Sequence, residues 1–250
     1  MLCAMKRHMI AIGDFEYIKD ETNSYHRILS QEERNMNLRF YKNHIYIDGD
    51  FENEDSIKKM SSKELHTKLQ NDLQRHNNAF EVLKKWELLP THNLNILDIG
   101  CGTGMFVYRW IYEKHGNGYG VDISPLVTYV SPARDVIEII DLNSINAPSI
   151  PSDVSLIVAR DIIEHLFEVT HLLSAVKIGV SVFIEIPIIP QGFTEADLMD
   201  YKYLHPTRHL HFYTQQGIEQ ELTKSGFRII KSELIKNNLK YLILVEKWKH

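Results

Sequence analysis

Apolar runs alternate with helical patterns along the chain from about residue 94 onward. The apolar runs predict strands at 94–99, 118–122, 135–141, 154–159 and 181–186. Between them, helical spacing predicts helices over 104–115 and 162–176 and a short helical segment at 124–129. Strands that are apolar along nearly their whole length are typical of a parallel sheet with helices on both faces. The pattern therefore predicts an α/β fold with a doubly wound sheet.

The C-terminal part of the chain continues this alternation. A helix is predicted over 214–225, and Gly226 ends it. Two strands follow at 228–234 and 241–246, joined by the polar turn KNNLK. The chain therefore ends in a helix and a strand hairpin.

The first ninety residues have a different pattern. Polar and apolar residues alternate over 39–48, which predicts a short strand or hairpin ended by Gly49. From residue 61 the apolar spacing is helical, with Ser62 as the expected N-cap and Pro90 as the stop. The apolar face of this helix contains Leu65, Leu69, Leu73, Phe80 and Leu83. We therefore expect residues 1–90 to form a mostly helical appendage whose last helix covers the sheet or a ligand cleft, and residues 91–250 to form the main domain.

The most specific motif lies where the first strand of the main domain ends. Residues 94–106, LNILDIGCGTGMF, pass from Asp98 into three glycines at alternate positions, Gly100, Gly102 and Gly104. Glycine permits left-handed backbone conformations and lets a ligand lie directly against the main chain. A dinucleotide fingerprint would need a further glycine at position 105 or 107, where the chain has methionine and valine. The spacing therefore disfavours a NAD or flavin site.

An acidic residue, Asp122, closes the second strand about twenty residues after the glycines. The pattern D-x-G-x-G-x-G followed by such a residue resembles the signature of class I S-adenosylmethionine-dependent methyltransferases, and the resemblance covers about residues 93–249. It implies a Rossmann-like sheet of seven strands, the last of them antiparallel, and S-adenosylmethionine as the cofactor. A structural turn without a ligand is the alternative for the glycines.

The resemblance also implies which residues bind the cofactor. The glycine turn would approach the methionine part, Asp122 would accept hydrogen bonds from the ribose hydroxyls, and Asp141 would meet the adenine. A helix-capping or turn role is the alternative for both aspartates. The expected cofactor-binding residues are Asp98, Gly100, Cys101, Gly102, Gly104, Asp122, Ile123, Asp141, Leu142, Arg160 and Asp161.

The segment after the fourth strand, ARDIIEHL at 159–166, resembles the D-x-x-E-H-L segment of small-molecule methyltransferases. Three roles are open for Glu164 and His165. They cap the following helix, or His165 acts as a general base because an imidazole titrates near pH ~6.5. In the third role they bind a divalent cation together with Asp161, as the resemblance to ubiquinone-pathway and small-RNA 2′-O-methyltransferases implies. We expect no metal dependence.

The connection over 187–214 is long and rich in aromatic residues and histidines, which predicts a lid. Its RHLHFYT run resembles the family segment that closes over the acceptor. His209 and His211 therefore join His165 as candidate catalytic residues. Ordinary surface or packing histidines are the alternative.

Composition restricts the class of partner. The chain has 33 acidic and 28 basic side chains and a formal net charge of -5, which disfavours a nucleic-acid substrate. The two cysteines, Cys3 and Cys101, indicate neither a disulfide framework nor a zinc site. No apolar run approaches the length of a membrane span, and the first residues lack an export signal. The sequence therefore predicts a cytoplasmic protein without a membrane partner.

These observations predict a methyltransferase that acts on a small polar acceptor, with a hydroxyl as the expected acceptor group. Sugar nucleotides, glycan precursors and secondary metabolites are the acceptors that the resemblance suggests. A metal-assisted 2′-O-methyltransferase acting on an RNA end is the first alternative, and a non-catalytic partner subunit with the same fold is the second. The sequence leaves the oligomeric state open.

Overall fold

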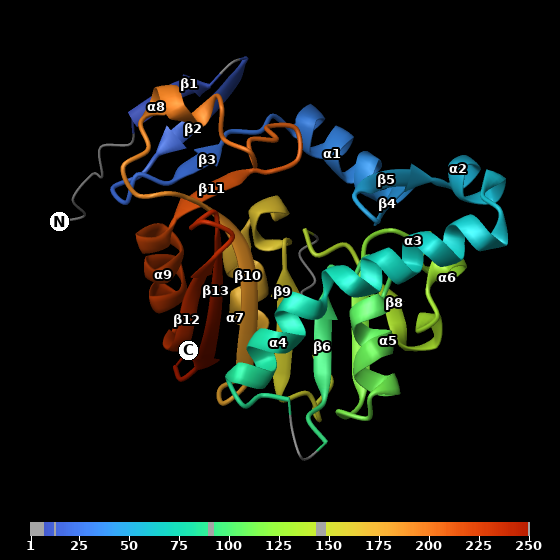
Figure 1. Cartoon of the computed structure of the whole chain (residues 1–250). Coiled ribbons are helices and arrows are strands. Elements are labelled where there is room, and N and C mark those ends of the chain that lie inside the picture. The colour runs from blue at the N-terminus through green and yellow to red at the C-terminus, as the bar shows by residue number, and fades with distance from the viewer. Residues whose placement is uncertain (1–7, 13, 90–92, 144–148, 250) are drawn as a thin grey trace.

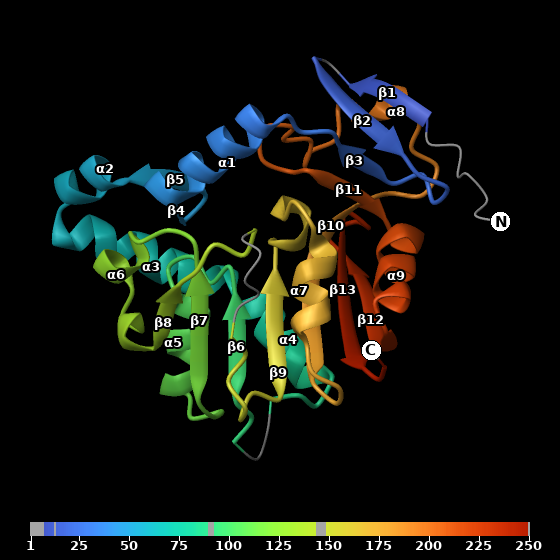
Figure 2. The ribbon, with the colours of Figure 1, turned by 180° about the vertical axis from the view of Figure 1, so that it is seen from behind.

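The computed structural model describes residues 8–12, 14–89, 93–143 and 149–249. A central sheet carries helices on both faces (Figures 1 and 2). Its main strands lie in the order β12–β13–β10–β9–β6–β7–β8, and every neighbouring pair is parallel except the two made by β13. Their bounds are β6 Ile96–Ile99, β7 Gly118–Asp122, β8 Ile137–Ile139, β9 Leu156–Arg160, β10 Ser181–Ile189, β12 Phe227–Ile235 and β13 Lys240–Lys247. The predicted Rossmann-like fold with an antiparallel last strand is confirmed.

Alternate residues of each strand pack on opposite faces of the sheet. On one face, Leu156 and Val158 of β9 join the cluster that contains Phe80 and Trp110. On the other face, Ile157 and Ala159 join the larger cluster with side chains of the opposite helices. This period of two follows from the strand geometry and explains why the strands are apolar throughout. The first face is covered by α3 (Ser62–Arg75), α4 (Asn77–Lys85) and α5 (Met105–Tyr112), and the second by α7 (Val169–Ala175) and α9 (Gln215–Lys224).

Two predicted helices differ from the observed ones. The helix expected over 162–176 is interrupted, because the backbone at Leu166 and Glu168 is extended, and it forms a 3-10 turn, η2 (Ile163–His165), and α7. The helix expected from residue 61 is capped by Ser61, whose side chain accepts a hydrogen bond from the Glu64 N–H, and not by Ser62. It gives way to α4 at His76, and α4 ends at Lys85. Pro90 lies outside the described residues.

The sheet extends beyond the predicted strands into the N-terminal part of the chain. The N-terminal strands β1 (His8–Ile12), β2 (Phe15–Lys19) and β3 (Tyr25–Arg27) pair in sequence, and β3 pairs with β11 (His211–Thr214). Strand β11 ends the segment 187–214, which the sequence predicts to be a lid and which is called the lid below. Because β11 also pairs with the end of β10, the sheet has eleven strands in the described part of the chain. Residues 8–27 and the lid thus form one structural unit.

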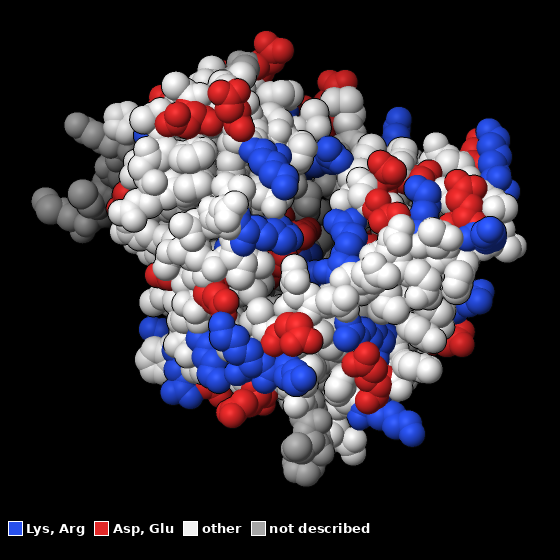
Figure 3. All heavy atoms as spheres, viewed as in Figure 1, with Lys and Arg blue, Asp and Glu red and all other residues white. Residues whose placement is uncertain are grey.

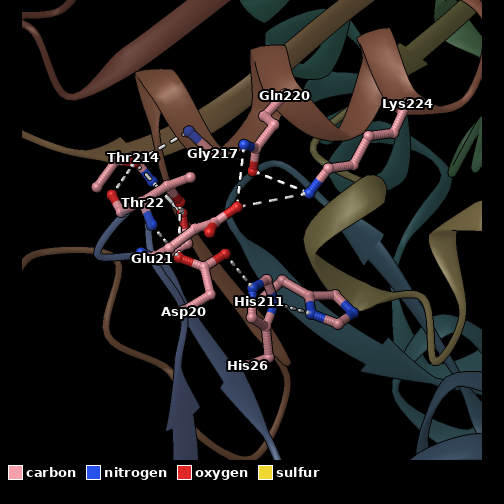
Figure 4. Close-up of polar contacts among 10 residues, drawn as sticks. Asp20, Glu21, Thr22, His26, His211, Thr214, Gly217, Gln220 and Lys224 are labelled. Carbon is pink, nitrogen blue, oxygen red and sulfur yellow. Dashed lines mark hydrogen bonds and ion pairs between the residues drawn. The ribbon is translucent and has the colours of Figure 1, made fainter. Parts of the chain in front are cut away.

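Polar contacts fasten this unit to the main domain (Figure 4). The Thr214 hydroxyl donates a hydrogen bond to the Thr22 carbonyl at 2.9 Å and accepts one from the Gly217 N–H at 3.1 Å, so it also caps α9. A Cβ at Gly217 would lie 1.9 Å from the Ser24 Oγ. The close approach of the β2–β3 turn to α9 therefore requires glycine at position 217.

The segment between β3 and α3 contains two helices and a hairpin. Helix α1 (Gln31–Asn43) leads into β4 (His44–Ile47), which pairs with β5 (Asp50–Asn53), and α2 (Glu54–Lys59) follows. The strand predicted over 39–48 is therefore wrong for residues 39–43, which are helical. Gly49 lies in the hairpin turn with a φ of 98° instead of ending the strand. The remaining short elements are α6 (Val127–Val130), η1 (Arg134–Val136) and α8 (Glu195–Leu198).

No helix among the described residues has the length and apolar character needed to cross a membrane.

Candidate active site

The residues singled out from the sequence gather at one edge of the sheet. Asp98 lies in β6 next to its last residue, Asp122 ends β7, Asp141 lies after β8, and Arg160 ends β9. These strands are parallel neighbours, so their carboxyl ends meet at the same edge, where open α/β sheets bind their ligands. In Figure 1 this edge lies below the lid and the elements of the first 60 residues.

The three glycines of the turn after β6 all have positive φ, at 69°, 53° and 71° for Gly100, Gly102 and Gly104. A Cβ at Gly100 would lie 2.8 Å from the Ile162 side chain, and one at Gly104 would lie 2.5 Å from the Ser131 Oγ. At Gly102 the nearest atom to a Cβ is the Tyr46 carbonyl oxygen at 3.8 Å. Close packing therefore requires glycine at positions 100 and 104. The space next to Gly102 is open, as a ligand that lies against the main chain requires.

Asp98 is a buried carboxyl group beside this turn, 5 % exposed. Burial raises its pKa to about 7, the nearby Arg160 opposes this rise, and Asp122 adds to it. A cationic ligand next to Asp98 would favour the ionised form and repay part of its desolvation. The residue therefore fits a positively charged cofactor.

Asp122 is tied to the backbone around it. One of its oxygens accepts a hydrogen bond from the Gly102 N–H at 2.8 Å, and the other accepts one from the Ser124 N–H at 2.9 Å. Burial raises its pKa to about 6, although these backbone hydrogen bonds oppose the rise. Each carboxylate oxygen has a second acceptor site, so both ribose hydroxyls could still be bound. Asp122 thereby also fixes the glycine turn.

The other residues expected to bind the cofactor differ in how far their side chains are buried. The Cys101 side chain is buried against Val107 and Ala133, which leaves only its backbone for a ligand. Leu142 is buried in the large core cluster in the same way, whereas Ile123 is half-buried in the loop after β7. Asp141 accepts a hydrogen bond from the Asn143 N–H and forms an ion pair with Lys42 of α1 at 3.3 Å.

Elements of the first ninety residues cover the glycine turn. The Asp72 carboxylate on α3 accepts a hydrogen bond from the Thr103 hydroxyl within the turn. Ile45 and Ile47 of the β4–β5 hairpin pack with Val127 and Val130 after β7. The appendage is therefore part of the candidate site. The sequence had predicted such a position only for the last helix of the appendage, which begins near residue 61.

Arg160 and Asp161 belong to a network of charges that sequence reasoning missed, and of its members only Asp161 is exposed. Arg160 donates a hydrogen bond to Glu185 of β10 at 3.0 Å and another to His76 of α3. Lys240 of β13 contacts Glu185 at 2.9 Å and both carboxylate oxygens of Asp161. Within an otherwise apolar strand, SVFIEI, the single carboxylate of Glu185 was the signal that could have revealed this network.

Glu164, His165 and His209 come together after β9, and with Tyr41 we call them the Glu164 cluster. One potential ligand atom of each of the first three lies within 4.8 Å of the others. Glu164 is 1 % exposed, and its two carboxyl oxygens have no hydrogen-bond partner among the described residues. Burial, with a smaller effect of Asp161, raises its pKa well above the usual range. An unpartnered buried carboxyl group is costly, which points to a bound polar group or ion that is part of the working site.

Both histidines of the cluster are held by backbone carbonyl groups. The Nδ1 of His165 lies 2.9 Å from the Arg208 carbonyl oxygen and 2.9 Å from the Tyr41 hydroxyl, and the Nδ1 of His209 lies 2.9 Å from the Tyr203 carbonyl oxygen. Because a carbonyl only accepts, each Nδ1 carries the proton and each Nε2 keeps its lone pair. Burial lowers both pKa values, that of His165 to about 4. Both rings are therefore neutral near pH 7.

His211 lies apart from these two histidines. Its Nε2 donates to the Leu166 carbonyl at 2.8 Å, and its Nδ1 lies 2.9 Å from the Nδ1 of His26 on β3 (Figure 4). Both ring nitrogens are thus engaged. His211 joins the lid to the N-terminal strands, and the structure does not bring it to the Glu164 cluster as a free base.

Comparison with known proteins assigns the chain to a family. It matches the methyltransferase domain family over residues 54–232. No curated protein sequence gives a match. The chain belongs to this family and is a class I S-adenosylmethionine-dependent methyltransferase, with S-adenosylmethionine as its cofactor.

Solved structures of low sequence identity share the fold. The 4+2 cyclase SpnF is 12% identical, with 70% of this chain and 82% of that chain covered and a TM-score of 0.56. Magnesium protoporphyrin IX methyltransferase from Synechocystis PCC 6803, solved with bound SAH, is 17% identical, with 70% and 83% covered and a TM-score of 0.51. A methyltransferase from Archaeoglobus fulgidus is 19% identical, with 69% and 94% covered and a TM-score of 0.53.

The pKa of Asp98 leads to a prediction about the pH dependence of cofactor binding. We expect the affinity for S-adenosylmethionine to rise about tenfold between about pH 5.5 and about pH 7.5, because Asp98 loses its proton near pH 7 and the carboxylate then attracts the cationic cofactor. Calorimetric titration at several pH values measures this. Asp98→Asn should remove the dependence near pH 7, and the exposed Asp135→Asn should retain it. An equal dependence in Asp98→Asn and the wild type would contradict this role of Asp98.

Proposed function

We propose that this protein transfers the methyl group of S-adenosylmethionine to a hydroxyl of a small polar acceptor bound at the Glu164 cluster. The observation that carries the proposal is the unpartnered, buried Glu164 beside two neutral histidines, directly after the strand that adjoins the glycine turn. Ile162 packs against Gly100, and Glu164 and His165 follow it closely in the chain. The cluster therefore lies within reach of a cofactor on the turn.

When bound, the cofactor supplies an activated methyl group and a neutral leaving group. The chain must hold the acceptor oxygen in line with the methyl carbon, exclude water and take up the hydroxyl proton. The Nε2 lone pairs of His165 and His209 can accept that proton, since their Nδ1 atoms donate to fixed carbonyl groups. Glu164 and the Tyr41 hydroxyl can hydrogen-bond the acceptor and orient it. We further propose that the expected cofactor-binding residues, from Asp98 to Asp161, hold the cofactor.

A second candidate mechanism is metal-assisted transfer. Glu164, His165 and His209 could ligate one divalent cation, and each histidine already donates its other ring N–H to a carbonyl, as metal-binding histidines usually do. A bound cation would lower the pKa of the acceptor hydroxyl. Asp161, the third residue of the sequence-based ligand set, is engaged by Lys240 at both oxygens, so His209 replaces it. This candidate includes methylation of an RNA end, which the net charge of -5 disfavours.

A screen of candidate acceptors by mass-detected methyl transfer tests the proposal. We expect methylation of at least one small hydroxyl compound by the wild-type protein. Unchanged turnover in EDTA favours the histidine mechanism, whereas loss of turnover that added magnesium, manganese or cobalt restores favours the metal-assisted one. Tight cofactor binding without transfer to any acceptor would contradict the proposal and favour a non-catalytic role. The fold alone does not decide between a catalytic and a non-catalytic role, because one fold supports several activities.

A further inference from the structure

The charged side chains next to the Glu164 cluster differ in how closely carboxylates pair with them. Arg160 and Lys240 are paired with Glu185 and Asp161, and the buried carboxyl group of Asp98 also acts on Arg160. Arg208 and Lys236 are additional cations close to these groups. Arg208 and Lys236 are therefore the two cations of this group that have no close carboxylate partner among the described residues, since the Lys236 Nζ lies 3.8 Å from the Glu185 oxygen.

Arg208 belongs to the lid and lies against the cluster. Its guanidinium carbon is 4.9 Å from the centre of the Phe51 ring, and its charge acts on Tyr41, His165 and His209. In the part of the chain that the structure describes, its side chain forms no ion pair with a carboxylate, whereas Arg160, the other arginine next to the cluster, is paired with Glu185. A half-buried guanidinium that lacks a carboxylate partner is suited to binding an anion through two parallel hydrogen bonds.

Lys236 approaches the same network from the turn between β12 and β13. Its Nζ lies 3.8 Å from a Glu185 oxygen that Lys240 already contacts at 2.9 Å, and 44% of its side chain is exposed. The turn holds three successive non-glycine residues with positive φ, Lys236 at 52°, Asn237 at 58° and Asn238 at 64°. Backbone strain of this kind is often retained at functional sites.

The surface agrees with this arrangement. Figure 3 shows a hollow between the lid and α3, with Lys and Arg side chains at its rim and acidic atoms deeper inside. A ligand entering there would meet positive charge before it reached these acidic groups. Such a rim favours anionic ligands and disfavours cationic ones.

We propose that the acceptor carries an anionic group, a phosphate or a carboxylate, which Arg208 and Lys236 bind while the hydroxyl reaches the Glu164 cluster. This inference rests on the proposed function and narrows its substrate class. Arg208 and Lys236 act as specificity-determining residues, because they contact a part of the acceptor remote from the reacting oxygen.

Direct binding of simple anions tests the proposed anion site at Arg208 and Lys236, and it does not require that the acceptor be known. Protein saturated with SAH is titrated in a calorimeter with inorganic pyrophosphate and, separately, with malonate, so that the two arms distinguish phosphate from carboxylate. We expect the wild type to bind at least one of them, R208Q to bind it about tenfold or more weakly, and K236Q to bind it less tightly than the wild type. R109Q is the matched control, since Arg109 also stacks on an aromatic ring, Phe80 at 3.9 Å, but lies on α5. All variants should keep the wild-type affinity for SAH, which shows that they are folded.

Equal anion binding by R208Q and the wild type, or no binding to the wild type at millimolar anion, would overturn the inference. A second experiment compares methyl transfer to glycerol, glycerol 3-phosphate and glycerate as a matched acceptor series within the screen. We expect higher kcat/KM for the charged compounds. An equal kcat/KM for glycerol would overturn the proposal that the acceptor is anionic, while methyl transfer to a hydroxyl would still stand. Failure of every compound in the wider screen would contradict the proposed function, and the anion titration would still be decisive for the binding site.

Discussion

We expect Gly102→Val to abolish binding of S-adenosylmethionine. Gly102 has a φ of 53°, a conformation that a β-branched residue rarely adopts, and its Cβ would point into the open space below the Tyr46 carbonyl. The added isopropyl group would fill the space that the cofactor needs next to the main chain. If the wild type binds with a Kd of about 1 μM, about 8 kcal/mol, a variant that shows no binding at millimolar cofactor has lost about 4 kcal/mol or more. Isothermal titration calorimetry measures both values.

Gly179→Val is a matched control for this substitution. Gly179 also has a positive φ, 85°, and a Cβ there would meet no atom within 4 Å, but it lies before the start of β10, at the opposite edge of the sheet. Both variants therefore bear a similar backbone strain. We expect Gly179→Val to bind the cofactor like the wild type and both variants to give the circular dichroism spectrum of a folded protein. Wild-type affinity in Gly102→Val would refute the assignment of this turn to the cofactor.

The glycine turn was predictable from sequence because its requirements are local. The conformation of each glycine and the strand before it depend on neighbouring residues, and β7 begins and ends where the apolar run 118–122 does. The same holds for the end of α9, where Gly226 has a φ of 84°. Local patterns therefore gave the fold class and the edge of the sheet where the site lies.

Helix α1 was missed although the chain contains its start signal. Ser30 and Glu33 form a capping box, in which the Ser30 hydroxyl accepts from the Glu33 N–H and the Glu33 carboxylate accepts from the Ser30 N–H. The strand predicted over 39–48 concealed this helix, because the last five helical residues, RFYKN, were counted together with the strand residues HIYI that follow them. Here the capping signal is a better guide than the period of the apolar residues.

Contacts between distant segments could not be predicted in this way. The pairing of β3 with β11 joins His26 to His211, and nothing near either residue in the sequence indicates the other. Similarly, Lys240 reaches Glu185 only because β13 runs antiparallel beside β10. The resemblance singled out three histidines, and only the tertiary pairing separates His211, which is engaged at both nitrogens, from His165 and His209.

The second large effect that we expect is a loss of turnover when His165 is replaced. We expect His165→Ala to lower kcat by about 100-fold or more, because general-base catalysis contributes a factor of this size and the His165 Nε2 is a free acceptor within the Glu164 cluster. The cofactor affinity should stay within about twofold of the wild-type value, since His165 lies off the glycine turn. His209→Ala should show the same pattern if the two rings share the proton, as the 4.6 Å distance between their ring centres allows. Steady-state kinetics with the acceptor found in the screen, together with calorimetry for the cofactor, measures these effects.

The split between kcat and KM identifies what each histidine does. A loss confined to kcat indicates an interaction made in the transition state, whereas a higher acceptor KM at unchanged kcat indicates positioning alone. His171→Ala is the control, because His171 is exposed on α7 and a general effect of losing a histidine would appear there as well. Near wild-type turnover in both His165→Ala and His209→Ala would rule out a histidine base. The proton would then pass to another group of the cluster, and Glu164→Gln would become the decisive variant.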